Sequence, residues 1–441
     1  MKKMHHILFV SAFALCFYFT PVMTPVMPID IVQAQEDEKK QKPRTRRSQT
    51  LSKSGGSKII SAQEKLSEGK HDEALNILNS LIASDRAKPY DKGVAQQFIG
   101  SVWADKGDYK RAAREFQRAI DMGVLPDNVV NDITFNLAQL YLAEDQTNKA
   151  LKLLNKWFKT AQDPGASAYA LRAQIYLIKE DLKRAERDID KAMAQSKEPR
   201  ESWYRIKLSI LLQQDRYKEA EPILELVVEQ FPGKKPFWQQ LSAVYFELGR
   251  EKKAFSARQS MHKQDMLTSS KELVNLAQLY LYNDYPYKAA KILSEGIEKG
   301  SIEKTEKNWE LLANSWMHSR EWKKSRGPLL NAAKKSKTGK FYIQLGQAYI
   351  QDEDWKKAEQ YLIKGLEKGK LKKREADSWL ILGITQTKLE KYEDAIKTFR
   401  KAGDYDEVAT DAFRWIRSLE RRLARIADKK KKQEEEAKKA S

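Results

Sequence analysis

The amino-acid sequence predicts an all-α fold: a right-handed superhelical solenoid of about ten helix-turn-helix repeats, closed by a C-terminal capping helix. Three observations lead to this prediction. Glycine and proline number only 19 and 13 among 441 residues, so little interrupts a helix. An alanine recurs along most of the chain, and a small residue precedes it by twelve positions in most copies. A chain of this length needs no single large core if each repeat packs only on its neighbours.

The clearest copy of the repeat lies close to the C-terminus. It reads W-x2-L-G and then A-x3-F, which is the spacing of a tetratricopeptide (TPR) helix pair within a unit of about 34 residues. We expect Gly383 to face Ala395 where the two helices cross. Trp379, Leu382 and Phe399 then supply the buried apolar area.

Ten copies can be aligned on this alanine. The aligned residues are Ala74, Ala112, Ala150, Ala185, Ala220, Ala254, Ala289, Ser325, Ala358 and Ala395. The small residue twelve positions earlier is replaced once, by Leu208. An aromatic residue usually follows the small residue by three positions, but Lys65 occupies this aromatic slot in the first copy, and the copy around Arg258 is irregular. The copies place a TPR solenoid at residues 58–428, with Asp406–Ala427 as its capping helix.

The N-terminal residues have the pattern of a secretory signal peptide. Lys2 and Lys3 precede a short apolar run, Ile7–Phe19, and Val32-Gln33-Ala34 offers a cleavage site. We therefore expect residues 1–34 to be removed and the protein to be exported to the periplasm of a Gram-negative bacterium. Two alternatives remain open: an uncleaved inner-membrane anchor, although the apolar run is short for a span, and a lipoprotein modified at Cys16.

The segments that flank the solenoid have little to bury. Residues 35–57 are rich in Arg, Ser and Gly and are expected to form a disordered basic linker, with a basic arm that binds a membrane or a partner as the alternative. Residues 429–441 alternate runs of Lys and Glu and are expected to form a charged disordered tail.

Composition narrows the class of function. The formal net charge is +20, which is compatible with nucleic acid, anionic lipid or acidic proteins as partners, or with a solvated lysine-rich surface. Export argues against nucleic acid, while peripheral membrane contact stays compatible. Cys16 is the only cysteine, and His71, His262 and His318 fall in different repeats. Since the sequence also has no phosphate-binding loop, we expect neither an enzyme, nor a bound metal, nor a cofactor.

Longer runs resemble one family. Residues 272–281, ELVNLAQLYL, are followed by PYKAAKIL at residues 286–293, and KWF at 156–158 with DPG at 163–165 adds to the likeness. These runs are similar to the exported TPR proteins encoded beside TonB, ExbB and ExbD components. The resemblance implies an accessory role in TonB-type energy transduction for outer-membrane transport, with envelope proteins such as TonB, ExbB or ExbD as partners. The alternatives are a scaffold for another envelope machine (secretion, pilus or cell-wall assembly) or a basic envelope-surface binder.

The partner-binding groove is expected on the first helix of each pair. One position of that helix carries a side-chain amide in five repeats: Gln139, Gln174, Gln278, Asn314 and Gln347. The position one turn further on is apolar: Leu142, Leu177, Leu212, Phe246, Leu281, Met317 and Ile350. Amides pair with both donors and acceptors of an extended peptide, and the apolar row can take its side chains. Packing between adjacent helices is the alternative role for both rows, but a buried amide without a partner would cost free energy. The four glutamines should therefore be partly accessible on the inner surface.

Overall fold

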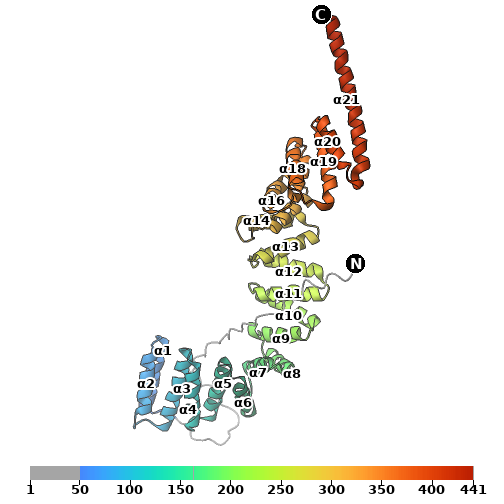
Figure 1. Cartoon of the computed structure of the whole chain (residues 1–441). Coiled ribbons are helices and arrows are strands. Elements are labelled where there is room, and N and C mark those ends of the chain that lie inside the picture. The colour runs from blue at the N-terminus through green and yellow to red at the C-terminus, as the bar shows by residue number, and fades with distance from the viewer. Residues whose placement is uncertain (1–49, 162, 441) are drawn as a thin grey trace. The chain divides into compact units, whose positions relative to one another are not determined.

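The computed structural model describes residues 50–161 and 163–440 (Figure 1). Within them, twenty α-helices form ten consecutive pairs and one further helix follows. The chain divides into two compact units, with the boundary between Val227 and Val228 inside helix α10. The expected signal peptide, residues 1–34, lies outside the described residues. In the part of the chain that is described, no helix combines the length and the apolar character needed to cross a membrane.

Unit 1 contains the first five pairs. Its helices are α1 (Lys53–Ser67), α2 (His71–Ala83), α3 (Pro89–Asp105), α4 (Tyr109–Asp121), α5 (Asp127–Ala143), α6 (Thr147–Thr160), α7 (Ala166–Ile178), α8 (Leu182–Ala194), α9 (Glu201–Gln213) and α10 (Tyr217–Gln230).

Unit 2 contains the other five pairs and the last helix. Its helices are α11 (Lys235–Glu247), α12 (Glu251–Lys263), α13 (Ser270–Tyr282), α14 (Pro286–Glu298), α15 (Glu306–His318), α16 (Trp322–Lys335), α17 (Lys340–Ile350), α18 (Trp355–Lys368), the 3-10 helix η2 (Lys372–Arg374), α19 (Glu375–Lys388), α20 (Tyr392–Ala402) and α21 (Asp406–Ala440). The expected number of about ten helix pairs is therefore confirmed.

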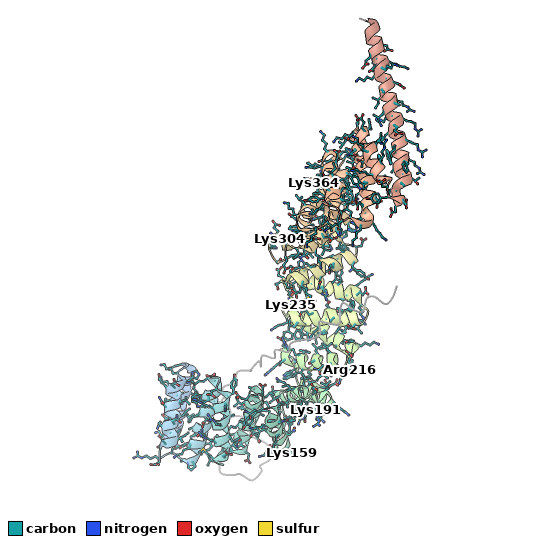
Figure 2. The ribbon with its side chains drawn as sticks, viewed as in Figure 1. Lys159, Lys191, Arg216, Lys235, Lys304 and Lys364 are labelled. Atoms are coloured by element: carbon teal, nitrogen blue, oxygen red, sulfur yellow. The ribbon has the colours of Figure 1, made fainter. Side chains whose placement is uncertain are left out.

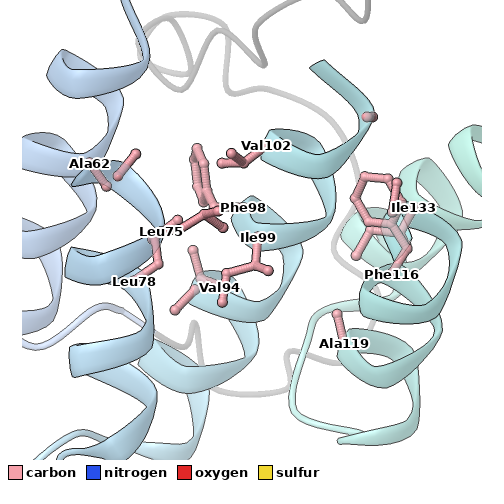
Figure 3. Packing of buried hydrophobic residues seen from close by; sticks show 14 of the residues in the cluster. Ala62, Leu75, Leu78, Val94, Phe98, Ile99, Val102, Phe116, Ala119 and Ile133 are labelled. Carbon is pink, nitrogen blue, oxygen red and sulfur yellow. The ribbon is translucent and has the colours of Figure 1, made fainter. Parts of the chain in front are cut away.

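Each pair is held by a close crossing of its two helices. The recurring alanines are buried, and most of them are fully inaccessible. At Gly383 the close crossing is occupied by Phe399, since a β-carbon on Gly383 would lie 2.6–2.8 Å from ring atoms of Phe399, one turn beyond Ala395 on α20. In the preceding pair a β-carbon on Gly346 would meet both Leu362 and the carbonyl oxygen of Ala358, the residue aligned with Ala395. The small residue of the first helix therefore faces the aligned alanine and the residue one turn beyond it. Gly100 meets Phe116 in the same way in unit 1, where Figure 3 shows the surrounding core.

A cation–π contact recurs inside the pairs. In seven of them, the basic residue that precedes the aligned alanine or serine lies over the aromatic ring of the first helix, 4.5–5.9 Å from its centroid. The contacts are Arg111 over Trp103, Lys149 over Tyr141, Arg184 over Tyr176, Lys253 over Tyr245, Lys288 over Tyr280, Lys324 over Trp316 and Lys357 over Tyr349. Each contributes about 0.5–1 kcal/mol at an exposed site. In the first pair Lys65 replaces the ring and forms an ion pair with Glu73 instead, at 3.6 Å.

The N-terminal end of the array differs from the expected linker. Helix α1 starts at Lys53, because the Ser52 hydroxyl caps it by accepting the Gly55 N–H. Asp91, fully buried on α3, accepts hydrogen bonds from the Ser52 N–H, the Ser52 hydroxyl and the Lys88 N–H. Burial alone would raise the pKa of Asp91, but these hydrogen bonds outweigh it and hold that pKa below its usual value. The start of the helical array is thus tied to the second pair.

The C-terminal end differs from the expected disordered tail. Helix α21 caps unit 2 through Val408, Ala412, Ile416 and Leu419, which pack against α19 and α20. It then continues to Ala440, so residues 429–440 are helical. The reason is local: Lys, Glu, Gln and Ala are all good helix formers, and this segment contains no proline or glycine.

Arg258 is the exception in the core of the helix pairs. The residue four positions after the aligned alanine or serine is a buried leucine, isoleucine or phenylalanine in the other nine pairs. In α12 it is Arg258, whose Nε–H donates to the Ser242 hydroxyl at 3.2 Å. Burial lowers the pKa of Arg258, and the nearby Glu272 carboxylate offsets part of this effect.

We expect Arg258→Leu to stabilise the chain by about 1 kcal/mol, because it removes a poorly compensated charge from an apolar site. Ser242 keeps a partner in the variant, since its hydroxyl also donates to the Ala254 carbonyl. Chemical denaturation measures the change. The reverse exchange at the matching position of the next pair, Leu293→Arg, should destabilise strongly. A loss of stability in Arg258→Leu would contradict this interpretation.

Candidate partner-binding surface

The first helices of successive pairs lie next to one another within each unit. In unit 1, α1 contacts α3, and α7 contacts both α5 and α9. In unit 2, the Lys235 ammonium on α11 lies 2.7 Å from the Glu272 carboxylate on α13. The predicted binding residues therefore belong to neighbouring helices.

The structure leaves the five predicted amides accessible. Gln278 is exposed, and Gln139, Gln174, Asn314 and Gln347 are half-buried. Among residues 50–161 and 163–440, none of these five side-chain amides has a hydrogen-bond partner. The partial accessibility of the four glutamines agrees with the expectation, and their role in binding stays a prediction.

The apolar row is less accessible than the amides. Leu177 is only 8% exposed and belongs to a buried cluster with Ile206 and Ile210 of α9. Leu142, Leu281, Met317 and Ile350 are half-buried and pack against the cores between pairs, and Leu212 is half-buried too. Only Phe246, at 49%, is exposed. Most of this row therefore packs one pair on the next, which is the alternative role that the sequence left open.

Tyr282 adds an exposed aromatic side chain to the candidate binding surface, and the sequence pattern did not identify it. It is the last residue of α13, four residues after Gln278, and 73% of its side chain is exposed. Its position one helical turn beyond the amide places both side chains on the same face. A search for exposed aromatic residues one turn from each amide would have found it.

A network of charged side chains joins α7, α8 and α9, and the sequence pattern did not reveal it. Asp188 on α8 is fully buried and accepts two hydrogen bonds from Arg172 on α7, at 2.5 and 3.1 Å. Lys207 on α9 lies 2.8 Å from both Glu186 and Asp190 of α8. The Arg172 guanidinium also stacks on the Phe158 ring, 3.6 Å from its centroid. These contacts join three successive helices in the C-terminal part of unit 1.

The ionisation of this network follows from its contacts. Hydrogen bonds from Arg216, with a further contribution from Lys207, hold the pKa of Glu186 below its usual value. Burial disfavours the Lys207 ammonium, but its bonds to Asp190 and Glu186 outweigh burial and raise the pKa of Lys207. The Glu186 carboxylate and the Lys207 ammonium are therefore both charged near neutral pH.

A separate pocket of about 490 Å³ lies in unit 2 between α14, α15 and α16. Trp309, Leu312 and Trp316 form its apolar wall, and the Lys324 ammonium lies 4.9 Å from the Trp316 ring centroid. Its chemistry suits an apolar or an acidic side chain. None of the twelve predicted groove residues lines it. In the described part of the chain, no group of three or more His, Cys, Asp or Glu side chains is arranged to hold a metal ion.

The fold and this surface define a class of protein: a helical-repeat protein in which first helices of several pairs carry accessible amides that have no partner among the described residues. Two stretches, residues 104–175 in unit 1 and residues 343–408 in unit 2, each match a family model described as tetratricopeptide repeat. The chain is therefore a protein with tetratricopeptide repeats in both units.

Solved structures with some likeness to this chain include other proteins of this kind. A tetratricopeptide repeat protein from Parabacteroides merdae shares 17% identity, with 60% of this chain and 99% of that chain covered at a TM-score of 0.40. MamA from Desulfovibrio magneticus RS-1 shares 20% identity, with 42% and 99% covered and a TM-score of 0.36. YrrB, described as a TPR protein with an unusual peptide-binding site, shares 22% identity, with 42% and 92% covered and a TM-score of 0.35. No curated protein matches the chain. The fold assignment rests on the helix pairs and the two family models.

Proposed function

We propose that the chain is a periplasmic scaffold whose inner helices bind an extended segment of another envelope protein. The observation that carries this proposal is the set of five accessible amides, which lack partners within the described residues. An amide offers both a donor and an acceptor, so the two amides of unit 1 and the three of unit 2 can each pair with the backbone of an extended peptide without selecting one side chain. Phe246 and Tyr282 add exposed aromatic area beside the row in unit 2.

The system that the scaffold serves is proposed from the sequence. The resemblance of residues 272–293 to exported TPR proteins supports an accessory role in TonB-type energy transduction, with TonB, ExbB or ExbD components as partners. The signal-like residues 1–34 support the periplasm as the location. A different envelope machine for secretion, pilus or cell-wall assembly is the second candidate. Affinity purification from cross-linked envelopes, followed by mass spectrometry, separates the two by the partners recovered.

We expect the double change Gln174→Glu and Gln278→Glu to weaken partner capture while leaving the melting temperature nearly unchanged. A carboxylate only accepts hydrogen bonds, so it cannot pair with peptide carbonyls, but an accessible carboxylate costs the fold little. Quantitative mass spectrometry of the captured partners measures the first effect, and thermal unfolding measures the second.

The matched control changes Gln195 and Gln360 to Glu. Both are exposed, Gln195 at the end of α8 and Gln360 in α18, so both belong to second helices. The control has the same net charge as the test variant and should capture partners as the parent does. If the test variant unfolds early, or captures partners like the parent, the inner helices are not the binding surface.

A further inference from the structure

The two units differ strongly in charge. The described residues of unit 1, 50–227, contain 28 basic and 26 acidic residues, a net charge of +2. Unit 2, residues 228–441, contains 45 basic and 31 acidic residues, a net charge of +14. The basic character of the protein is therefore concentrated in unit 2, although both units contain lysine and arginine on their surfaces (Figure 2).

Within unit 2, basic side chains gather at the ends of α16 and α18. Eight of them are exposed, and we call this set the basic ridge: Lys334, Lys335, Lys337, Lys364, Lys370, Lys372, Lys373 and Arg374. Among the described residues, none of the eight forms an ion pair. Residues 334–340 and 364–377 together contain ten basic residues against three acidic ones, Glu367, Glu375 and Asp377. Local carboxylates therefore leave most of this charge uncompensated.

Contacts between the two segments hold the ridge together. The Gly339 N–H donates to the Gly369 carbonyl at 2.9 Å, which joins the turn after α16 to the turn after α18. The Lys368 ammonium donates to the Ala333 carbonyl at the end of α16, at 2.8 Å. Lys368 is thus engaged in the structure, while the eight ridge side chains point to solvent. The two turns form one continuous surface.

The backbone of the second turn contains left-handed residues. Lys370 and Lys372 have φ angles of +58° and +55°, and Gly369 between α18 and Lys370 has +67°. Eight other non-glycine residues in turns of the described chain share this conformation, so it shapes the turn without marking a binding site. Lys334 and Lys335 lie in the last turn of α16, where the negative end of the helix dipole favours positive side chains. The helix dipole does not account for Lys370, Lys372 and Lys373, which lie beyond α18.

We propose that the basic ridge binds the anionic phospholipid surface of a membrane. Seven of its eight residues are lysines, and lysine is depleted in protein–protein interfaces, where arginine is enriched. Arginine suits paired, directional contacts, whereas the lysine ammonium is a point charge that tolerates mobile headgroups. Clusters of four to eight such residues bind anionic headgroups electrostatically. This role is independent of peptide binding on the inner helices.

The contact is electrostatic and does not insert side chains into the bilayer. The described residues with large exposed apolar side chains include Phe246, Tyr282, Tyr287 and Phe413, and none of these exposed side chains lies in the ridge. Binding should therefore weaken steeply as salt is added, because mobile ions screen exposed charges over about 10 Å at 0.1 M.

Co-sedimentation of the full chain with vesicles tests the proposal. We compare vesicles of phosphatidylcholine mixed with phosphatidylglycerol against phosphatidylcholine alone. Binding to the neutral vesicles reports apolar contributions, including any from residues 7–19, so the difference between the two vesicle types measures the electrostatic contribution of the whole chain. The parent should bind the anionic vesicles more strongly, and added salt should abolish that difference.

The test variant changes Lys337, Lys370, Lys372 and Lys373 to Gln. Its extra binding to anionic vesicles should fall on the order of 100-fold or more. The matched control changes Lys152, Lys156, Lys159 and Lys183 to Gln, four exposed lysines of unit 1, so the net charge is the same. The control should retain most of the binding, and circular dichroism should show both variants folded.

Three outcomes would overturn the proposal. Equal losses in both variants would show that net charge, not the ridge, attracts the vesicles. Equal binding of the parent to both vesicle types would show that anionic lipid is not recognised. Ridge-dependent binding to polyglutamate without binding to anionic vesicles would show that the ridge takes an acidic protein segment.

Discussion

Asp188→Ala should lower the free energy of unfolding by about 3–5 kcal/mol, because it leaves the Arg172 guanidinium largely buried without its counter-ion. The side chain of Asp188 is fully buried, and that of Arg172 is only 13% exposed. Arg187 cannot replace the lost counter-ion of Arg172, because it is itself positively charged. It would also lose its own contact with the Asp188 carboxylate, at 3.5 Å. Chemical denaturation of the full chain measures the loss.

A second variant separates charge from packing. Most pairs have a leucine directly before the small residue of the first helix, as at Leu137 and Leu241, and Arg172 occupies this position in α7. The double change Arg172→Leu and Asp188→Leu should therefore be close to neutral or stabilising. Arg187→Ala should cost well under 1 kcal/mol, because Arg187 is 57% exposed.

The site of the damage gives a further check. In a repeat array each pair depends mainly on its neighbours. Hydrogen exchange in Asp188→Ala should therefore increase first in α7, α8 and α9. A double variant as unstable as the single one would refute the interpretation that an unpaired charge causes the loss.

The repeat could be located from the sequence because the close crossing of the two helices requires a small residue at regular intervals. Where two helices cross closely, only a small side chain fits, so Ala74, Ala289 and Ala395 recur at matching places and are fully buried. The extent of the last helix could not be located in this way. Residues 429–434 are exposed and leave no periodic pattern, and only helix propensity favours the observed continuation of α21.

The core positions that carry charge could not be predicted. Arg172, Asp188 and Arg258 are charged residues within helical sequences, where a pattern normally indicates solvent exposure. Whether such a side chain is buried depends on which residues of another helix it meets. Local spacing along one helix does not encode those contacts. Gly383 is a second example. The repeat spacing predicted that this position requires a small residue, but it did not predict that the Phe399 ring is the group that packs against it.

The exposure of the candidate binding residues was predicted with mixed success for a physical reason. An amide such as Gln278 is costly to bury alone, so its residue type already favours exposure. A leucine is compatible with either environment, and Leu177 is buried against α9, whereas Phe246 at the matching position is exposed. The residue type was therefore enough to predict that the amides are accessible. It was not enough to predict which residues of the apolar row are exposed.

Gly339→Ala should destabilise unit 2 by on the order of 1–3 kcal/mol or more, because the added methyl group overlaps with neighbouring backbone. A β-carbon on Gly339 would lie 1.8 Å from the Gly365 carbonyl oxygen. The backbone of Gly339, with φ of −75°, suits alanine, so the steric overlap alone causes the loss. A shift that relieved the overlap would also strain the hydrogen bond from the Gly339 N–H to the Gly369 carbonyl.

Gly327→Ala is the matched control for this change. Gly327 lies inside α16, and a β-carbon there would meet nothing within 4 Å. Alanine in a helix interior is favoured over glycine by about 0.5–1 kcal/mol, but a β-carbon here also crowds the ring of the following Pro328. The two effects oppose each other, so this variant should change the stability less than Gly339→Ala does. Chemical denaturation compares the two variants, and hydrogen exchange should show early opening of α17 and α18 in Gly339→Ala only. If Gly327→Ala loses as much stability as Gly339→Ala, the close approach of Gly339 and Gly365 does not limit the stability of unit 2.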